Sequence, residues 1–250
     1  MTLGELVGYL DSYLRVTEAA DAPNALNGLQ VENSGRVERL GAAVDACEAT
    51  IDLAAAARVS LLVVHHGLFW DGLEPLRGPR YRRLAGLIRH DLALYSAHLP
   101  LDLHPEVGNS AVLARALGVA VRGPFGTAHG APVGVWGELA LERSELARRL
   151  ANVLGSPPRL LGFGPEKTGR VGIVTGAGGS LIGEAAAAGL DSLITGEGAH
   201  HTFFAAEELH LNVYYAGHYA TETLGVKALC DHVAARFGLP WTFLDHPSGL

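Results

Sequence analysis

Residues 39–67 read RLGAAVDACEATIDLAAAARVSLLVVHHG, and this stretch decides the fold. Residues 39–46 and 60–65 are short apolar runs that predict strands, and the alanine-rich stretch 49–58 between them predicts a helix. The second run is apolar throughout, which is typical of a strand in a parallel sheet that is covered on both faces. The stretch therefore predicts a strand–helix–strand unit of an α/β fold.

The alternation of strands and helices continues on both sides of this unit. We expect an N-terminal helix in the first turns of the chain and further helices over residues 80–90, 106–117, 143–154, 181–188, 201–209 and 221–237. Further strands are expected over residues 91–98, 133–140, 171–176, 191–196 and 212–217. This order predicts an α/β protein with mixed sheets.

The chain also contains an internal repeat. A shift of 131 positions places residues 39–67 on 170–198, where ten of the 29 aligned residues are identical. Further on the shift becomes 120, so that His98 falls on His218 and Asp102 falls on Glu222. Two similar α/β segments can match by chance, but we interpret the repeat as a duplication. It predicts two similar lobes, of which the first spans residues 1–125 and is completed by 219–250, and the second spans 126–218.

Composition narrows the class of protein. The chain has 250 residues, a length that is sufficient to bury a sizeable core. Its contents of 48% hydrophobic and 18% charged residues are ordinary for a globular protein. The formal net charge of −7 argues against a general nucleic-acid binder. Two cysteines are too few for a disulfide framework, and the start of the chain shows no basic segment of a signal peptide. We expect a cytoplasmic protein without a membrane span.

Polar residues that can bind a metal follow four of the predicted strands. The carboxyl ends of strands are where open α/β sheets collect ligands. Imidazoles and carboxylates gather there without sulfur, a set that suits zinc, manganese, iron, cobalt or nickel. The four segments are His65–His66, His98–Asp102, Glu197–His201 and His218–Glu222.

The spacing within these segments predicts how the side chains would meet. His218 and Glu222 are four residues apart where a strand enters a helix, which places them on one helical face. Asp102 follows Pro100 and is expected in a turn. The repeat has a glycine where the first copy has His65, so we expect the strand to stop near residue 64. His65 and His66 would then lie in a turn and bind different ions of a metal pair.

Other features have structural explanations that compete with a functional one. His90, His104, His129, His210, His232 and His246 are expected to be structural or surface residues, and His200–His201 opens a predicted helix. The arginines at positions 77, 80, 82, 83 and 89 fit either a phosphate-binding patch or a solvated helix face, and we favour the solvated face. GAGGS at 176–180 could hold an anion on backbone amides, but it is no P-loop.

Five motifs in this order resemble the Nif-three-like dinuclear metal-centre family, whose members are partly named GTP cyclohydrolase I type 2 homologues. They are NGLQV (27–31), VVHHGLFW (63–70), YSAHLPLD (95–102), TGE (195–197) and AGHYATE (216–222). The resemblance implies two similar α/β lobes, a metal pair in the cleft between them, and a homohexameric ring. It also implies two divalent ions per chain with five ligands: His65, His66, Asp102, His218 and Glu222.

The resemblance and the residues together predict a metal-dependent hydrolase that acts on a nucleotide. Two neighbouring ions can make hydroxide available near neutral pH, and the target implied by the family is C8 of the guanine ring of GTP. We expect His98, Glu197 or His201 to carry protons. The alternatives are a two-metal phosphoesterase, and a metal-binding scaffold or interaction protein without turnover.

Overall fold

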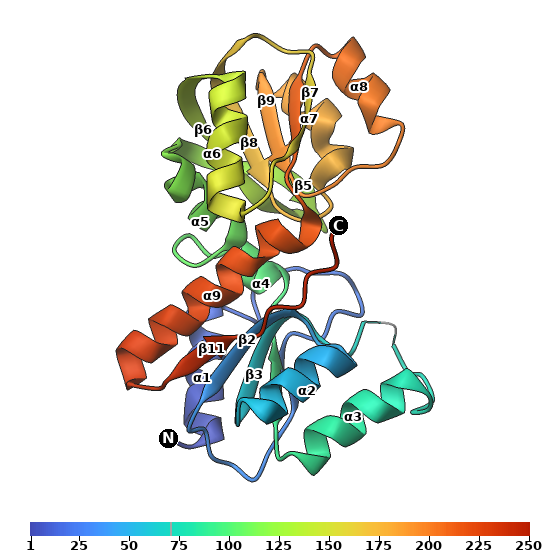
Figure 1. The fold of residues 1–250 in the computed structure, drawn as a ribbon, viewed down its shortest axis with the longest axis vertical. Coiled ribbons are helices and arrows are strands. Elements are labelled where there is room, and N and C mark those ends of the chain that lie inside the picture. Colours follow the sequence, from blue (N-terminus) through green and yellow to red (C-terminus); the bar gives the residue numbers. More distant parts are fainter. Residues whose placement is uncertain (71) are drawn as a thin grey trace. The chain divides into compact units, whose positions relative to one another are not determined.

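The computed structural model describes residues 1–70 and 72–250 (Figure 1). The chain forms two compact units, each with its own sheet. The first consists of Met1–His104 and Gly225–His246, and the second of Pro105–Leu224 and Pro247–Leu250. The longest helix, α9 (His218–Phe237), starts in the second unit and continues into the first. Among the described residues, no helix is both long enough and apolar enough to cross a membrane.

The first unit has a five-stranded sheet of order β1-β4-β3-β2-β11. Its strands are β1 (Gly28–Val31), β2 (Leu40–Asp45), β3 (Leu61–His66), β4 (Ala93–Ser96) and β11 (Trp241–Phe243). The edge strand β1 is antiparallel to β4, whereas the other neighbours run parallel. The helices are α1 (Leu3–Leu14), α2 (Glu48–Ala56), α3 (Pro79–Arg89) and the single turn α4 (Leu99–Asp102).

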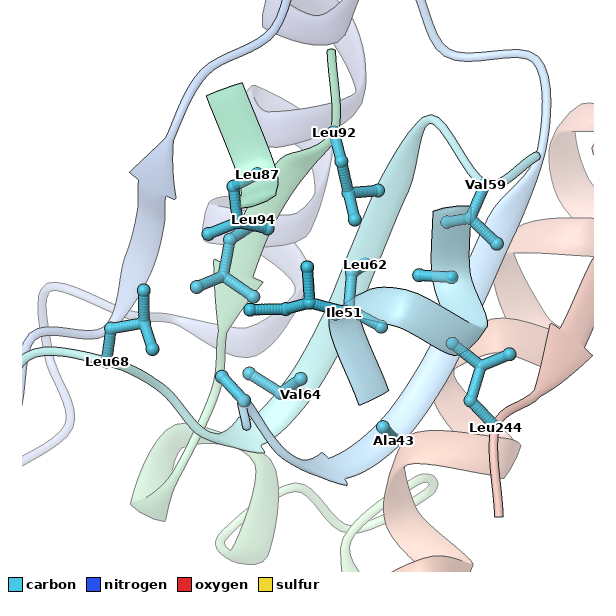
Figure 2. Packing of buried hydrophobic residues seen from close by; sticks show 12 residues of the cluster. Ala43, Ile51, Val59, Leu62, Val64, Leu68, Leu87, Leu92, Leu94 and Leu244 are labelled. Atoms are coloured by element: carbon cyan, nitrogen blue, oxygen red, sulfur yellow. The ribbon is translucent and has the colours of Figure 1, made fainter. Parts of the chain in front are cut away.

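The core of this unit explains why residues 39–67 fold as predicted. Because side chains alternate along a strand, Leu62 and Val64 of β3 face one side, where Ile51 of α2 and Leu87 of α3 pack on them (Figure 2). Tyr95 of β4 faces the other side, and its hydroxyl donates to Asp11 of α1 at 2.8 Å. Helices thus cover both faces, which accounts for the uninterrupted apolar sequence of β3.

The second unit has a six-stranded sheet of order β5-β6-β8-β9-β10-β7. Its strands are β5 (Ala120–Ala128), β6 (Ala131–Glu142), β7 (Arg159–Gly162), β8 (Lys167–Val174), β9 (Ser192–Thr195) and β10 (Asn212–Tyr215). β8, β9 and β10 are parallel, and β5, β6 and β7 add antiparallel pairs. The helices are α5 (Asn109–Leu117), α6 (Arg143–Leu154), the 3₁₀ turn η1 (Gly178–Leu181), α7 (Ile182–Ala187) and α8 (Thr202–Glu208). The predicted α/β class with mixed sheets is confirmed.

The register of the parallel strands fits the internal repeat. Leu40 of β2 lies opposite Leu61 of β3, and Val171 of β8 lies opposite Ser192 of β9, so both strands keep the same shift of 131 positions. A shared register is a stronger sign of duplication than shared alanines, because a one-residue slip would turn every side chain to the other face.

The third strand of the repeat differs by one residue from the sequence alignment. Ser96 of β4 pairs with Val64, and Tyr215 of β10 pairs with Thr195, which gives a shift of 119 (215 − 96). The alignment placed Tyr95 on Tyr215. The extra residue enters after the strand, where Gly217 has a φ of +91°, a conformation that glycine adopts easily. His218 therefore lies one position farther from its strand than His98 does.

Candidate metal centre

His65 and His66 are the last two residues of β3, and the prediction that the strand stops near residue 64 is wrong. The ladder continues because His66 lies opposite Asp45 in the parallel pair of β2 and β3. Neighbouring side chains of a regular strand point to opposite faces, yet the ring centroids of His65 and His66 are only 4.8 Å apart, with the rings tilted by 46°. The His65 side chain is fully buried, and that of His66 is 24% exposed.

Both rings are held at the same nitrogen. Nδ1 of His65 donates to the carbonyl oxygen of Ala97 at 2.9 Å, and Nδ1 of His66 donates to Oδ1 of Asp45 at 2.9 Å. An oxygen at Nδ1 favours the neutral tautomer with its proton there, and this leaves the lone pair on Nε2. Metal-binding histidines are commonly oriented in this way by carboxylate or carbonyl oxygens.

Asp102 lies close to His65, but not in the predicted turn. It ends the short helix α4, and its backbone N–H donates to the carbonyl of His98 at 3.1 Å. The helix forms because Pro100 fits the first helical turn, where no backbone donor is needed. Oδ2 of Asp102 lies 3.4 Å from Nε2 of His65. A carboxylate and an imidazole thus face each other in the first unit.

His98 joins this group from the loop before α4. One ligand atom from each of His65, His66 and His98 lies within 4.8 Å of the others. Nδ1 of His98 bonds Oδ1 of Asp21 at 2.8 Å, and Asn27 donates to the other oxygen of Asp21 at 2.8 Å. Burial alone would raise the pKa of Asp21, but the hydrogen bonds from His98 and Asn27 outweigh it and lower this pKa to about 2.

In the second unit, His218 and Glu222 meet on the first turn of α9. The predicted i, i+4 relationship is found, with Nε2 of His218 at 3.1 Å from Oε2 of Glu222. Nδ1 of His218 donates to Oε1 of Glu197 at 2.8 Å, so this imidazole too is held at Nδ1 by an oxygen. The hydrogen bond to Glu222, supported by Glu197, raises the pKa of His218 to about 9 although burial opposes it.

Two glycines leave room for this pair. Gly176 has a φ of +66°, its backbone N–H donates to Oγ1 of Thr221 at 3.1 Å, and a β-carbon there would collide with Oε1 of Glu222. A β-carbon at Gly196 would come within 2.7 Å of the backbone Cα of His218. The backbone at Gly176 and Gly196 therefore lies very close to the start of α9. This close approach is possible because neither residue has a side chain.

His201 and Glu197 line one pocket in the second unit. The pocket has a volume of about 410 Å³ and is also lined by Ala177, Gly179, Ser180, Gly198, Ala199 and Thr202. His201 stands at the start of α8, whereas the ring of His200 packs against Phe204 at a centroid distance of 5.6 Å. The GAGGS segment and the EGAHH segment thus form two walls of this pocket.

Arg82 of α3 fits the solvated helix face that we favoured, whereas the Arg80 side chain is only 12% exposed. Arg82 makes a two-pronged ion pair with Glu48 of α2, with N–O distances of 2.7 and 2.9 Å, and Arg80 pairs with Glu74. Glu48 and Arg82 are largely exposed. The exposed pair of Arg82 and Glu48 contributes little to stability, and it occupies the guanidinium group of Arg82 that a phosphate would need.

Three polar residues near the candidate site were missed by sequence reasoning. Asp21 and Asn27 support His98, and Asp45 supports His66. Asn27 lies in one of the quoted motifs, and Asp45 is the polar end of an otherwise apolar strand. A polar residue at the carboxyl end of a strand beside a histidine-bearing strand was the signal that could have pointed to Asp45.

Comparison with known proteins places these residues in a family. The family model of Duf34/NIF3 (NGG1p interacting factor 3) matches residues 1–248. The chain belongs to the Duf34/NIF3 family. A relative from Deinococcus radiodurans is 44% identical over 248 residues, which cover 98% of this chain and 94% of that protein. A relative from Halobacterium salinarum is 44% identical over 256 residues with full coverage of both. Both are named GTP cyclohydrolase 1 type 2 homolog.

Solved structures of related proteins agree with the fold. A protein from Thermus thermophilus superposes with a TM-score of 0.93 at 44% identity and full coverage of both chains. Reduced HcgD from Methanocaldococcus jannaschii superposes with a TM-score of 0.87 at 26% identity, with 98% of each chain covered. The resemblance read from the sequence motifs is confirmed. In this Duf34/NIF3 member the five predicted ligands fall into two groups, one in each unit: His65, His66 and Asp102, and His218 and Glu222.

Proposed function

We propose that the five residues of the two groups together hold two divalent metal ions, and that the protein is a metal-dependent hydrolase that opens the ring of a guanine nucleotide. The observation that carries this proposal is common to all the histidines involved. In His65, His66 and His218, Nδ1 is hydrogen-bonded to an oxygen atom. The nitrogen that each ring would use to bind a metal is therefore Nε2.

The donor set fits a transition metal rather than calcium or magnesium. Three imidazole nitrogens and two carboxylates, Asp102 and Glu222, are ligands that zinc, manganese, iron, cobalt and nickel accept, and the choice among them stays open. When bound, a pair of such ions lowers the pKa of water and provides a hydroxide near neutral pH.

The other polar residues have supporting parts in the proposal. His98 accepts a proton at Nε2 from the attacking water, because its Nδ1 is already bonded to Asp21. Glu197 holds His218 at Nδ1, and Glu197 and His201 line the 410 Å³ pocket, which is of the size that binds small molecules. The curated relatives' name, GTP cyclohydrolase 1 type 2 homolog, supports GTP as the first substrate to test.

The test incubates metal-loaded protein with GTP and, separately, with a simple phosphodiester. Attack at C8 of the guanine ring is expected to give a ring-opened product and, after a second hydrolysis, formate. His65→Ala should lose this activity, whereas the surface variant His90→Ala should keep it. Turnover of the phosphodiester alone would favour a phosphoesterase. No turnover of either by metal-loaded protein would favour a metal-binding scaffold and contradict the proposal.

Assembly is a separate proposal. The homohexameric ring that the family resemblance implies predicts a light-scattering mass near six chains. A protein that stays monomeric across a wide concentration range would contradict it. The outcome does not bear on the ligands, because all five belong to one chain.

A further inference from the structure

Asp21 receives hydrogen bonds from four donors, although it lies in a loop that forms no regular element. Oδ1 accepts from the backbone N–H of Ala22 at 2.7 Å and lies 2.8 Å from Nδ1 of His98. Oδ2 accepts from Nδ2 of Asn27 at 2.8 Å and from the backbone N–H of Leu99 at 3.2 Å. The Asp21 side chain is only 6% exposed, so water has little access to these bonds.

This arrangement determines which nitrogen of His98 carries a proton. Two backbone N–H groups cannot act as acceptors, so Asp21 must present an oxygen to each of them. The amide of Asn27 is fixed as well, because its Oδ1 accepts from the backbone N–H of His98 at 2.8 Å and its Nδ2 must therefore point at Asp21. Because both carboxylate oxygens of Asp21 act as acceptors, Nδ1 of His98 is the donor in its bond to Asp21. The lone pair of the His98 ring is then on Nε2.

The rest of the His98 ring is also held in place. Trp70 contacts it edge-on at a centroid distance of 4.7 Å, and the His65 ring lies at 4.9 Å. The Trp70 ring is itself fixed by a hydrogen bond from Nε1 to the carbonyl of Gly67 at 2.9 Å. Backbone, ring plane and tautomer of His98 are thus each fixed by a different contact.

We propose that Asp21 is a positioning residue that, together with Asn27, fixes the Nδ1–H tautomer of His98 and aims its Nε2 at the group formed by His65 and His66. The catalytic consequence rests on the proposed function, whereas the tautomer is a property of the protein by itself. An imidazole in water prefers its proton on Nε2, so the preference must reverse inside the protein. Asp21 acts through His98 and touches no reacting atom.

The decisive variant is Asp21→Asn, which keeps the size of the side chain but replaces one acceptor by an amide donor. If the new NH₂ group takes the place of Oδ2, it faces two donors, the amide of Asn27 and the backbone N–H of Leu99. If it takes the place of Oδ1, it faces the backbone N–H of Ala22 and Nδ1 of His98, and the contact with His98 is relieved when the His98 proton moves to Nε2. The second orientation leaves fewer opposed donors, so we expect it with the changed tautomer.

Asp52→Asn is the matched control, because Asp52 is an exposed carboxylate of the same unit. If Asp21→Asn does not fold, Asn27→Ala weakens the same arrangement and should shift the tautomer in the same direction.

The measurement is ¹⁵N NMR of histidine-labelled, zinc-loaded protein, with the His98 signals assigned by their loss in His98→Gln. We expect the Nδ1–H tautomer in the wild type and in Asp52→Asn, and a population of Nε2–H in Asp21→Asn. If the wild type has Nε2–H, or if Asp21→Asn leaves the tautomer unchanged, the proposal is overturned.

Kinetics separate the positioning role from a structural one. Asp21→Asn should lower kcat at least about tenfold and leave KM and zinc content nearly unchanged. A tautomer change without loss of kcat would overturn the catalytic part of the proposal. If the wild type turns over no GTP at all, the proposed function fails, and the NMR result still decides the role of Asp21 at His98.

Discussion

Asp45 ends strand β2 and accepts a hydrogen bond from Nδ1 of His66, the last residue of the neighbouring strand β3, at 2.9 Å. This bond selects the tautomer that has its lone pair on Nε2, the form in which an imidazole can bind a metal. We predict that Asp45→Ala lowers metal affinity by roughly 10- to 100-fold. The fold should be unaffected, because the Asp45 side chain is 47% exposed. Chelator competition measures the affinity, and a value equal to that of an Asp52→Ala control would contradict the prediction.

The five proposed ligands come from both units, so each unit should be needed for full metal loading. We predict that His65→Ala and Glu222→Ala each reduce the number of bound ions, because each removes a buried donor. Metal analysis of refilled protein measures the effect, and His90→Ala, which changes an exposed histidine, is the control. A large loss of stability with unchanged metal content would instead identify these side chains as ordinary core residues.

Metal-free protein should show a pH dependence that originates at His218. The hydrogen bond to Glu222 raises the pKa of His218 from 6.5 to about 9, so folding favours the charged form. The stabilisation is fully present below pH 6.5 and is lost as the pH rises through about 9. Because the ring is 26% exposed, we expect on the order of 1–3 kcal/mol. Urea unfolding between pH 6 and 10 measures it, and Glu222→Gln should flatten the curve. Titration of His218 near 6.5 would disprove the account.

Gly176 lies in a tight turn of the second unit, directly beside the proposed ligand Glu222. Its positive φ disfavours any other residue, and a β-carbon would displace Glu222. We predict that Gly176→Ala lowers the free energy of unfolding by more than about 1 kcal/mol and weakens metal binding. The matched control is Gly183→Ala in helix α7, where a β-carbon meets open space. That change should raise stability by about 0.5–1 kcal/mol. Equal effects of the two substitutions would show that the tight approach at Gly176 is unimportant.

The elements predicted best from the sequence are those whose own residues show the apolar pattern of a buried strand or helix. β3 and α2 were recognised because Leu62, Val64 and Ile51 are apolar at the spacing of buried elements. Strands β1, β5, β7 and β11 were missed. β5 contains Arg122, Gly123 and Pro124, which weaken any strand pattern, and it forms because β6 pairs with it along its length. Pairing of this kind depends on a neighbour, and a local sequence pattern does not contain it.

The candidate site likewise has residues that the local sequence predicts and residues that it does not. The histidines and carboxylates that follow the predicted strands indicated the candidate metal ligands. The i, i+4 spacing of His218 and Glu222 predicted that their side chains meet on one face of a helix. The supporting residues Asp21 and Asp45 were not predicted. They act on histidines 77 and 21 positions away, and only the folded chain brings them together.

An anomalous-scattering map from crystals of metal-loaded protein tests the central claim most directly. The proposal predicts two peaks per chain, with His65, His66 and Asp102 and also His218 and Glu222 at coordination distance, about 2.0–2.3 Å for nitrogen and oxygen ligands. The absorption edge would identify the metal in the same experiment. Loaded protein that shows no peak beside these five residues would contradict the proposed metal centre.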